Sequence, residues 1–183
     1  MNIYKQLENN HSKENSLKII KYIGKDENRF EELMSCFFIK SKDYRVPQRA
    51  AHVVSNCFDQ SPELIEPYVP LLIEKLLNPE TSNPLKRNIL RILRHSEISV
   101  DKKAEVYDFV YNLLIDPKEE IAIRAFSMSV LYNLTQDFPE LMPELKSTIE
   151  FILEKSESSP GIRSRGRLTI IELEKDLAKR GFQ

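Results

Sequence analysis

Apolar residues recur at helical spacing along most of this chain. Between positions 99 and 115 they occur at i, i+3, i+4, i+7 and i+8, which places them on one stripe of a helix: Val106, Phe109, Val110, Leu113 and Leu114. The preceding segment shows the same pattern: Leu85, Ile89, Ile92 and Leu93. No segment shows the sustained period-2 alternation of a strand. The pattern therefore predicts an all-α fold.

Periodicity, prolines and cap-forming residues together predict nine helices. The expected ranges are 13–24, 27–39, 45–58, 62–77, 84–95, 101–115, 119–134, 140–156 and 162–179. Pro67 and Pro70 fall inside the fourth range. Because proline removes a backbone donor and clashes with the preceding turn, we expect that helix to begin late or to kink. We expect residues 1–11 to fray.

Two features repeat along the chain at an interval close to one helical hairpin. Arg49, Arg87 and Arg124 lie 38 and 37 residues apart, and each enters an apolar pattern. The tripeptide Pro-Glu-Leu occurs at 62–64 and again at 139–141. Such a period is typical of stacked helical hairpins, which bury their apolar faces against neighbouring hairpins. The sequence therefore predicts a solenoid formed by one domain over residues 1–183.

Composition and charge narrow the classes of function. The chain has 27 Lys and Arg residues against 28 Asp and Glu, so its bulk charge attracts neither nucleic acid nor an anionic membrane. It has no apolar stretch of membrane-spanning length and no secretory leader, so we expect a cytoplasmic protein without a membrane partner. Cys36 and Cys57 lie within apolar patterns and are expected to be reduced, buried thiols.

The sequence contains no motif that specifies catalysis. Nucleophile elbows, zinc-binding helices and glycine-rich phosphate loops are absent, and the chain has only four glycines. His11, His52 and His95 lie far apart, without Cys, Asp or Glu at metal-ligand spacing. We therefore expect no enzymatic activity, no cofactor and no bound metal.

One unit of the repeat resembles the HEAT-like repeat, in which a proline precedes an acidic residue by two positions and an aliphatic-arginine pair follows. Pro117, Glu119, Ile123 and Arg124 match all four positions. Other units match in part, through Asp43, Gln48 and Arg49, through Ser82, Lys86 and Arg87, and through Ser164, Arg165 and Gly166. The chain is similar to small bacterial HEAT-like proteins with an armadillo-type fold. The resemblance implies a right-handed α-α superhelix of four to five hairpins, with a ladder of arginine and acidic residues between repeats.

The expected second helix of each hairpin is acidic. Residues 62–77, 101–116 and 140–155 each carry a net charge of −2. Because second helices line the concave face of HEAT-like solenoids, the resemblance implies an acidic concave surface. The candidate binding residues there are Glu63, Glu66, Glu105, Asp108, Glu140 and Glu144. The alternative is that these side chains only solvate helix surfaces.

The expected first helix at 84–95 is basic and contains no acidic residue. At 100° per residue, Arg91 and Arg94 fall opposite the apolar stripe that begins at Leu85. We expect these arginines to form an exposed ridge, which either contacts an anionic partner or serves only solubility.

These features favour a non-enzymatic adaptor that binds another protein on its concave face, because solenoids expose a large surface for their length. The alternative is a DNA-binding or DNA-lesion-processing module of the HEAT-like glycosylase type. Resemblance to those enzymes would imply a basic groove with aromatic side chains and a catalytic Asp. This chain has no Trp and an acidic expected groove, so nucleic acid is the less favoured partner.

Overall fold

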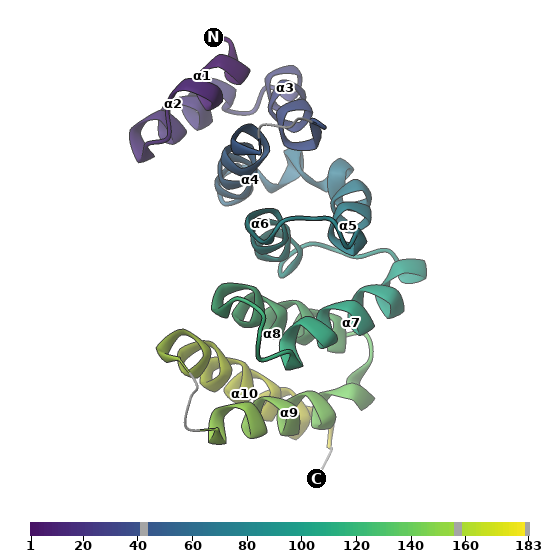
Figure 1. The fold of residues 1–183 in the computed structure, drawn as a ribbon. Coiled ribbons are helices and arrows are strands. Elements are labelled where there is room, and N and C mark those ends of the chain that lie inside the picture. The colour runs from purple at the N-terminus through teal and green to yellow at the C-terminus, as the bar shows by residue number, and fades with distance from the viewer. Residues whose placement is uncertain (41–43, 156–158, 182–183) are drawn as a thin grey trace. The chain divides into compact units, whose positions relative to one another are not determined.

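The computed structural model describes residues 1–40, 44–155 and 159–181. Helix accounts for 79% of the chain. Over the described ranges the structure contains helices and turns but no strand (Figure 1). The all-α fold predicted from apolar spacing is therefore confirmed.

The helices fall into two compact units, residues 1–92 (unit 1) and 93–183 (unit 2). Unit 1 contains α1 (Ile3–Asn9), α2 (Lys13–Ile23), α3 (Glu27–Phe38), α4 (Arg45–Phe58), α5 (Val69–Leu77) and α6 (Asn83–Leu93), whose last residue begins unit 2. Unit 2 contains α7 (Val100–Ile115), α8 (Ile121–Thr135), α9 (Met142–Glu154) and α10 (Pro160–Arg180). Three short 3-10 helices, η1 (Pro62–Leu64), η2 (Glu66–Tyr68) and η3 (Pro139–Leu141), lead into α5 and α9.

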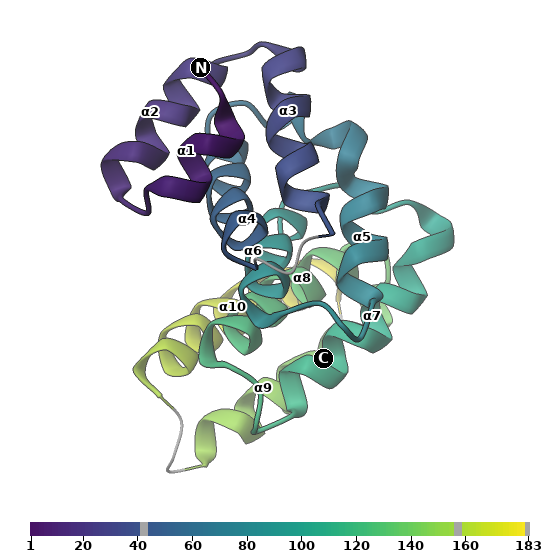
Figure 2. The ribbon, with the colours of Figure 1, turned by 45° about the horizontal axis from the view of Figure 1, so that its top comes forward.

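The N-terminus of unit 1 is ordered, contrary to the expectation of fraying. Helix α1 packs against α3 and α4, which lie side by side (Figures 1 and 2). Ile3 and Leu7 of α1 are buried, and the backbone N–H of Ile3 donates to Glu32 Oε1 at 3.0 Å. The side chain of Asn2 caps the helix by accepting from the backbone N–H of Lys5. A cap and two buried side chains therefore hold this short helix in place.

The prolines of the fourth expected helix delay its start, as predicted. Pro62 and Pro67 fall in the 3-10 helices η1 and η2, and the α-helix begins only at Val69. Pro70 occupies the first turn of α5, where its missing N–H would have no intrahelical partner. Acidic Glu63 and Glu66 consequently lie on 3-10 turns rather than on an α-helix.

In unit 2, α8 packs against α7 and α10, and α10 also packs against α9. The predicted stripe of α7 forms part of the core, with Val106, Val110 and Leu114 fully buried. Gly166 allows α10 to approach α9 closely, since a Cβ atom there would lie 3.0 Å from the side chain of Leu153. A larger residue at this point of the helix would therefore displace the side chains of Leu153 and Ile149.

Two of the repeated arginines join helices through backbone carbonyls. Arg49 of α4 donates from Nη1 to the carbonyls of Leu7 and Glu8 at 2.6 and 2.9 Å, near the end of α1. Arg124 of α8 donates from Nε to the carbonyl of Leu114 at 2.9 Å, near the end of α7. The last carbonyls of a helix lack intrahelical partners and carry partial negative charge, so a guanidinium stabilises them.

The expected acidic partners contribute less to this arrangement. Burial lowers the pKa of Arg124, and the carboxylate of Asp116 partly opposes that effect. Asp43, the acidic residue expected in one repeat, lies outside the described residues. The contacts of Arg49 and Arg124 indicate a structural role based on helix ends.

We predict that Arg124→Ala lowers the free energy of unfolding by about 1 to 3 kcal/mol, because it leaves the Leu114 carbonyl without its donor. Urea denaturation followed by circular dichroism measures the change. Arg167→Ala, at an exposed position of α10, is the control and should change stability by less than about 0.5 kcal/mol. Equal losses in the two variants would contradict the structural role of Arg124.

Both cysteines should be unreactive in the native protein. Burial raises the pKa of Cys36 to about 11, with a further contribution from Glu32, and raises that of Cys57 to about 12. Because the thiolate is the reactive form, Ellman's reagent at pH 8 should modify the native protein at least about 100-fold more slowly than the unfolded chain. Rapid modification of either thiol without denaturant would show that the thiol is accessible in the native protein and would contradict its burial.

Candidate functional site

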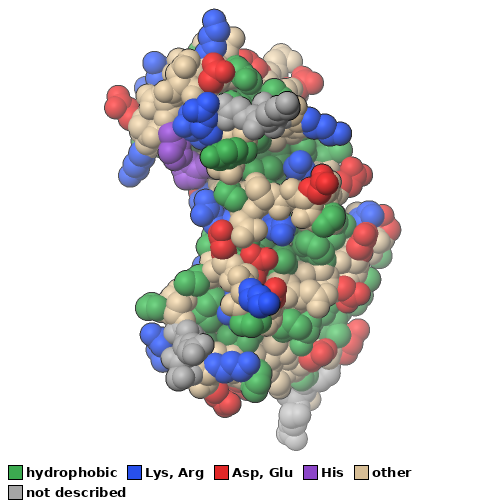
Figure 3. All heavy atoms as spheres, viewed as in Figure 1, with side chains coloured by type: hydrophobic (Ala, Val, Ile, Leu, Met, Phe, Trp, Pro, Cys, Tyr) green, Lys and Arg blue, Asp and Glu red, His purple; other side chains and the backbone are tan. Residues whose placement is uncertain are grey.

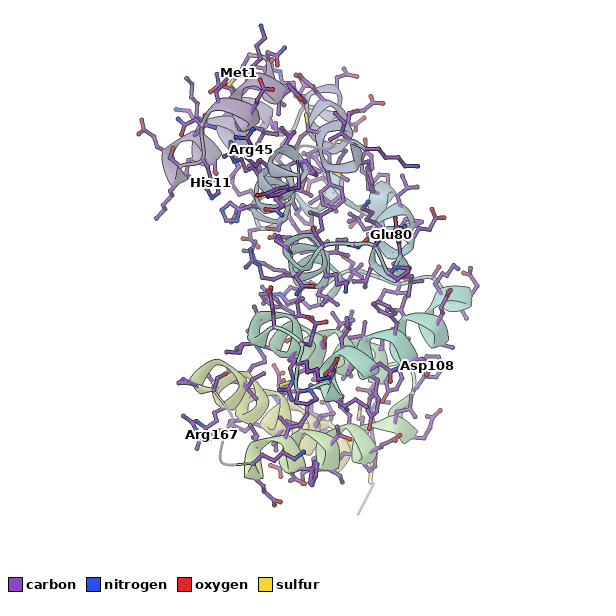
Figure 4. All side chains as sticks on the ribbon, viewed as in Figure 1. Met1, His11, Arg45, Glu80, Asp108 and Arg167 are labelled. Atoms are coloured by element: carbon purple, nitrogen blue, oxygen red, sulfur yellow. The ribbon has the colours of Figure 1, made fainter. Side chains whose placement is uncertain are left out.

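Two of the predicted acidic residues, Asp108 and Glu144, line the same pocket. This pocket of about 340 Å³ lies between α7 and the segment leading into α9, entirely within unit 2. We call it the tyrosine pocket; it is lined by Ala104, Tyr107, Asp108, Tyr111, Phe138, Leu141 and Glu144. Carboxylates and apolar side chains lie together over α7 and α9 in Figure 3, and Figure 4 labels Asp108 on α7.

Helical spacing places the α7 side of the pocket on one face. Its four residues occur at i, i+3, i+4 and i+7, beginning at Ala104 and ending at Tyr111. The opposite side comes from the turn into α9: Phe138 precedes η3, Leu141 ends it, and Glu144 lies in the first turn of α9. The positive end of the α9 dipole stabilises the Glu144 carboxylate at that position.

The two tyrosines differ in how their hydroxyls are satisfied. Their rings are stacked, with centroids 6.0 Å apart and an interplanar angle of 16°. The hydroxyl of Tyr111 forms a hydrogen bond with Thr148 Oγ1 at 2.9 Å. The hydroxyl of Tyr107 is buried and has no hydrogen-bond partner among the described residues. An unpartnered buried hydroxyl costs stability, so the pocket keeps a polar group that no described residue satisfies.

The carboxylates of the pocket affect the titration of the Tyr107 hydroxyl. Burial raises the pKa of Tyr107 to about 12, and the negative charges of Glu144 and then Asp108 add to the effect of burial. The tyrosine pocket therefore combines negative potential with three aromatic rings. A cation is attracted both by carboxylates and by the faces of aromatic rings, so a lysine or arginine side chain suits this surface.

A second acidic and aromatic pocket lies in unit 1 and includes Glu63. This pocket of about 330 Å³ is lined by Glu27, Asn28, Phe30, Glu31, Glu63, Leu64, Pro67 and Tyr68. The rings of Phe30 and Tyr68 meet edge to face at 5.6 Å. Burial and then the charges of Glu31 and Glu27 raise the pKa of Tyr68. Glu63 forms an ion pair with Lys25 at 3.3 Å. The pKa of Glu63 is lowered mainly by a hydrogen bond to its own backbone, and Lys25 lowers it further.

The other three predicted acidic residues are exposed but line neither pocket. Glu66 lies on η2 and Glu140 on η3. Glu105 lies on α7 and pairs with Lys102 at 2.8 Å. The structure thus brings together only part of the predicted acidic set, at Asp108 and Glu144.

The predicted exposed ridge of Arg91 and Arg94 is wrong, because both side chains take part in packing. Arg91 of α6 donates to Ser55 Oγ of α4 at 2.9 Å and forms an ion pair with Asp59. Only 24% of its side chain is exposed. Arg94 is partly buried, and its guanidinium lies 5.5 Å from the ring centroid of Phe126. Helical-wheel angles identified the face of these residues but not the neighbours that cover it.

Sequence reasoning missed Tyr107, Tyr111 and Phe138. A signal was present on α7, where positions 104, 107, 108 and 111 form a second stripe beside the core stripe. Phe138 gave no such signal, because its place depends on how the turn before η3 packs in three dimensions.

Metal and membrane sites were sought across the described ranges. No group of three or more His, Cys, Asp or Glu side chains in these ranges could hold a metal ion. None of the described helices combines the length and apolarity needed to span a lipid bilayer.

Comparison with known proteins identifies the repeat. The family model of the HEAT repeat domain matches residues 3–172, from α1 into α10. Comparisons with curated proteins and with solved structures found no match. A family model that matches this much of the sequence agrees with the all-helical fold. The chain therefore belongs to the HEAT repeat family.

Proposed function

We propose that this chain is a non-enzymatic adaptor that binds a basic segment of another protein at the tyrosine pocket. HEAT repeats commonly mediate protein interactions, which supports a binding role in general terms. The observation that carries the finer proposal is the meeting of Asp108, Glu144 and three aromatic rings at one concave site.

The chemistry of the pocket favours a cationic side chain over an apolar one. Two exposed carboxylates at the rim would lose hydration without compensation beneath an apolar partner, whereas an ammonium or guanidinium group would pair with them. The aromatic rings in the lining add cation-π attraction, worth roughly 0.5 to 2 kcal/mol depending on desolvation. In the free protein the Tyr107 hydroxyl is buried and unpartnered, and we propose that a shift of its ring on binding lets it accept from the same cation.

We predict that Asp108→Asn combined with Glu144→Gln weakens partner binding by about tenfold or more, because both charges face the bound cation. A tagged pull-down with mass spectrometry identifies the partner, and isothermal titration calorimetry with the purified partner measures affinity. The matched control is Glu105→Gln with Glu140→Gln, which removes the same charge from α7 and from η3, the turn that leads into α9, at exposed positions outside the pocket. If the two double variants weaken binding equally, the partner binds a diffuse acidic surface and not the tyrosine pocket.

We predict that Tyr107→Phe changes stability and partner affinity in opposite directions. Removing a buried hydroxyl without a partner should raise the free energy of unfolding by about 0.5 to 1 kcal/mol, whereas partner affinity should fall several-fold. Tyr111→Phe is the comparison, because it breaks the bond to Thr148 and should lower stability by about 1 kcal/mol. Denaturation and calorimetry measure both quantities. A Tyr107→Phe variant that is less stable but binds normally would argue against a ligand role for this hydroxyl.

A further inference from the structure

Another concave site in unit 1 has the opposite charge. It has a volume of about 440 Å³ and is formed by α4, α6 and the segment before α2. We call it the basic pocket; its lining residues are His11, Arg45, Gln48, Arg49, His52, Pro84 and Arg87. Figure 4 labels His11 and Arg45 on this part of unit 1, and Figure 3 shows histidine side chains next to basic ones there.

Helical spacing builds most of this site from α4. Arg45, Gln48, Arg49 and His52 occur at i, i+3, i+4 and i+7, so they project from one face of the helix. Arg87 comes from the first half of α6, and His11 immediately precedes α2. Donor groups from three segments therefore converge on one small volume.

The lining of the basic pocket includes no described carboxylate. The pKa of His52 is lowered first by burial and then by the positive charges of Arg91, His11 and Arg87. Asp59, which directly follows α4, is already paired with Arg91 and lines a neighbouring pocket. The lining of this site thus carries more positive than negative side chains, which favours a bound anion.

Two of the three arginines in the lining, Arg49 of α4 and Arg87 of α6, differ in a way that suits ligand binding. Arg49 is held in place by the carbonyls of Leu7 and Glu8, which use its Nη1 atom. Arg87 is partly exposed and forms no hydrogen bond or ion pair with a residue of the ranges 1–40, 44–155 and 159–181. One guanidinium is therefore preorganised by the fold, and the other keeps its donors for a ligand.

We propose that the basic pocket binds a phosphate monoester group. Guanidinium groups match the geometry of phosphate oxygens, and Gln48 and His11 supply further donors, whereas His52 Nε2 already accepts from the amide of Asn56. A monoester dianion carries two negative charges on one small group, and this pocket gathers its positive side chains in one small volume. Duplex DNA instead presents a row of singly charged phosphates and needs a track of cations, so convergence on one pocket favours the monoester. This site lies in unit 1 and is independent of the partner proposed for the tyrosine pocket.

The test is a titration of the intact chain with inorganic phosphate, followed through the histidine Cε1–H resonances in proton NMR. Sodium chloride at matched ionic strength is the reference. The His11 and His52 resonances should shift saturably with phosphate and remain unchanged with chloride, whereas the His95 resonance should not respond. Arg87→Gln should weaken phosphate binding by about tenfold, because it removes one charge-assisted contact. Arg163→Gln, at an exposed position of α10, should leave it unchanged.

Phosphoserine and a short DNA duplex distinguish the possible sources of the phosphate group. Phosphoserine that binds at least as tightly as inorganic phosphate, with the same loss in Arg87→Gln, supports a monoester carried by a larger molecule. Duplex DNA that binds more tightly than either, with a steep salt dependence, overturns the proposal in favour of nucleic acid. Phosphate shifts that fail to saturate, or that persist unchanged in Arg87→Gln, overturn it as well. A failure here leaves the tyrosine-pocket experiments unaffected, because those variants lie in unit 2.

Discussion

The structure depends on burying apolar stripes that no single helix or hairpin can cover alone. In unit 2, Ile123, Val130 and Leu134 of α8 are almost completely removed from water because α7 and α10 pack on either side of that helix. Burial of this kind is the main favourable term in folding. Each helix thus gives its apolar face to its neighbours and leaves its polar face for other contacts. The tyrosine pocket and the basic pocket are both formed by side chains on such outward faces.

Sequence periodicity was sufficient to predict most of the helices, but it did not predict which helices contact one another. The stripe of Leu85, Ile89, Ile92 and Leu93 is buried as its spacing predicts, since the 3.6-residue period is a local property. The late start of α5 also followed from proline geometry alone. Helix α1 was missed because its order depends on contacts with α3 and α4, which lie outside its own seven residues.

Polar contacts between repeats explain the error at Arg91. Its partners Ser55 and Asp59 lie 36 and 32 residues earlier in the chain, close to one repeat period. Tyr111 and Thr148 are likewise separated by 37 residues, and Lys103 and Asp137 by 34. A helical wheel shows only the angle of a side chain on its own helix. The repeat period contained the missing information, because residues one period apart can meet when successive hairpins stack.

The candidate site was predictable only in its charge. Asp108 and Glu144 were identified by the acidity of their helices, but the aromatic rings between them depend on how the turn at η3 packs against α7. The basic pocket was likewise hidden, although Arg45, Gln48, Arg49 and His52 share one face of α4. Taken singly, these residues resemble solvated or structural side chains. They form a candidate binding site only because three segments bring them together.

The central claim is that the tyrosine pocket binds a cationic side chain, and NMR of the tyrosine rings tests it most directly. The intact protein, labelled with ¹³C-tyrosine, is titrated with a short arginine- and lysine-containing peptide and with an acidic peptide of equal length. The claim predicts saturable shifts of the Tyr107 and Tyr111 ring resonances with the basic peptide alone, while Tyr4 in α1 remains unchanged. Shifts that spare Tyr107 and Tyr111, or that appear equally with the acidic peptide, would contradict it.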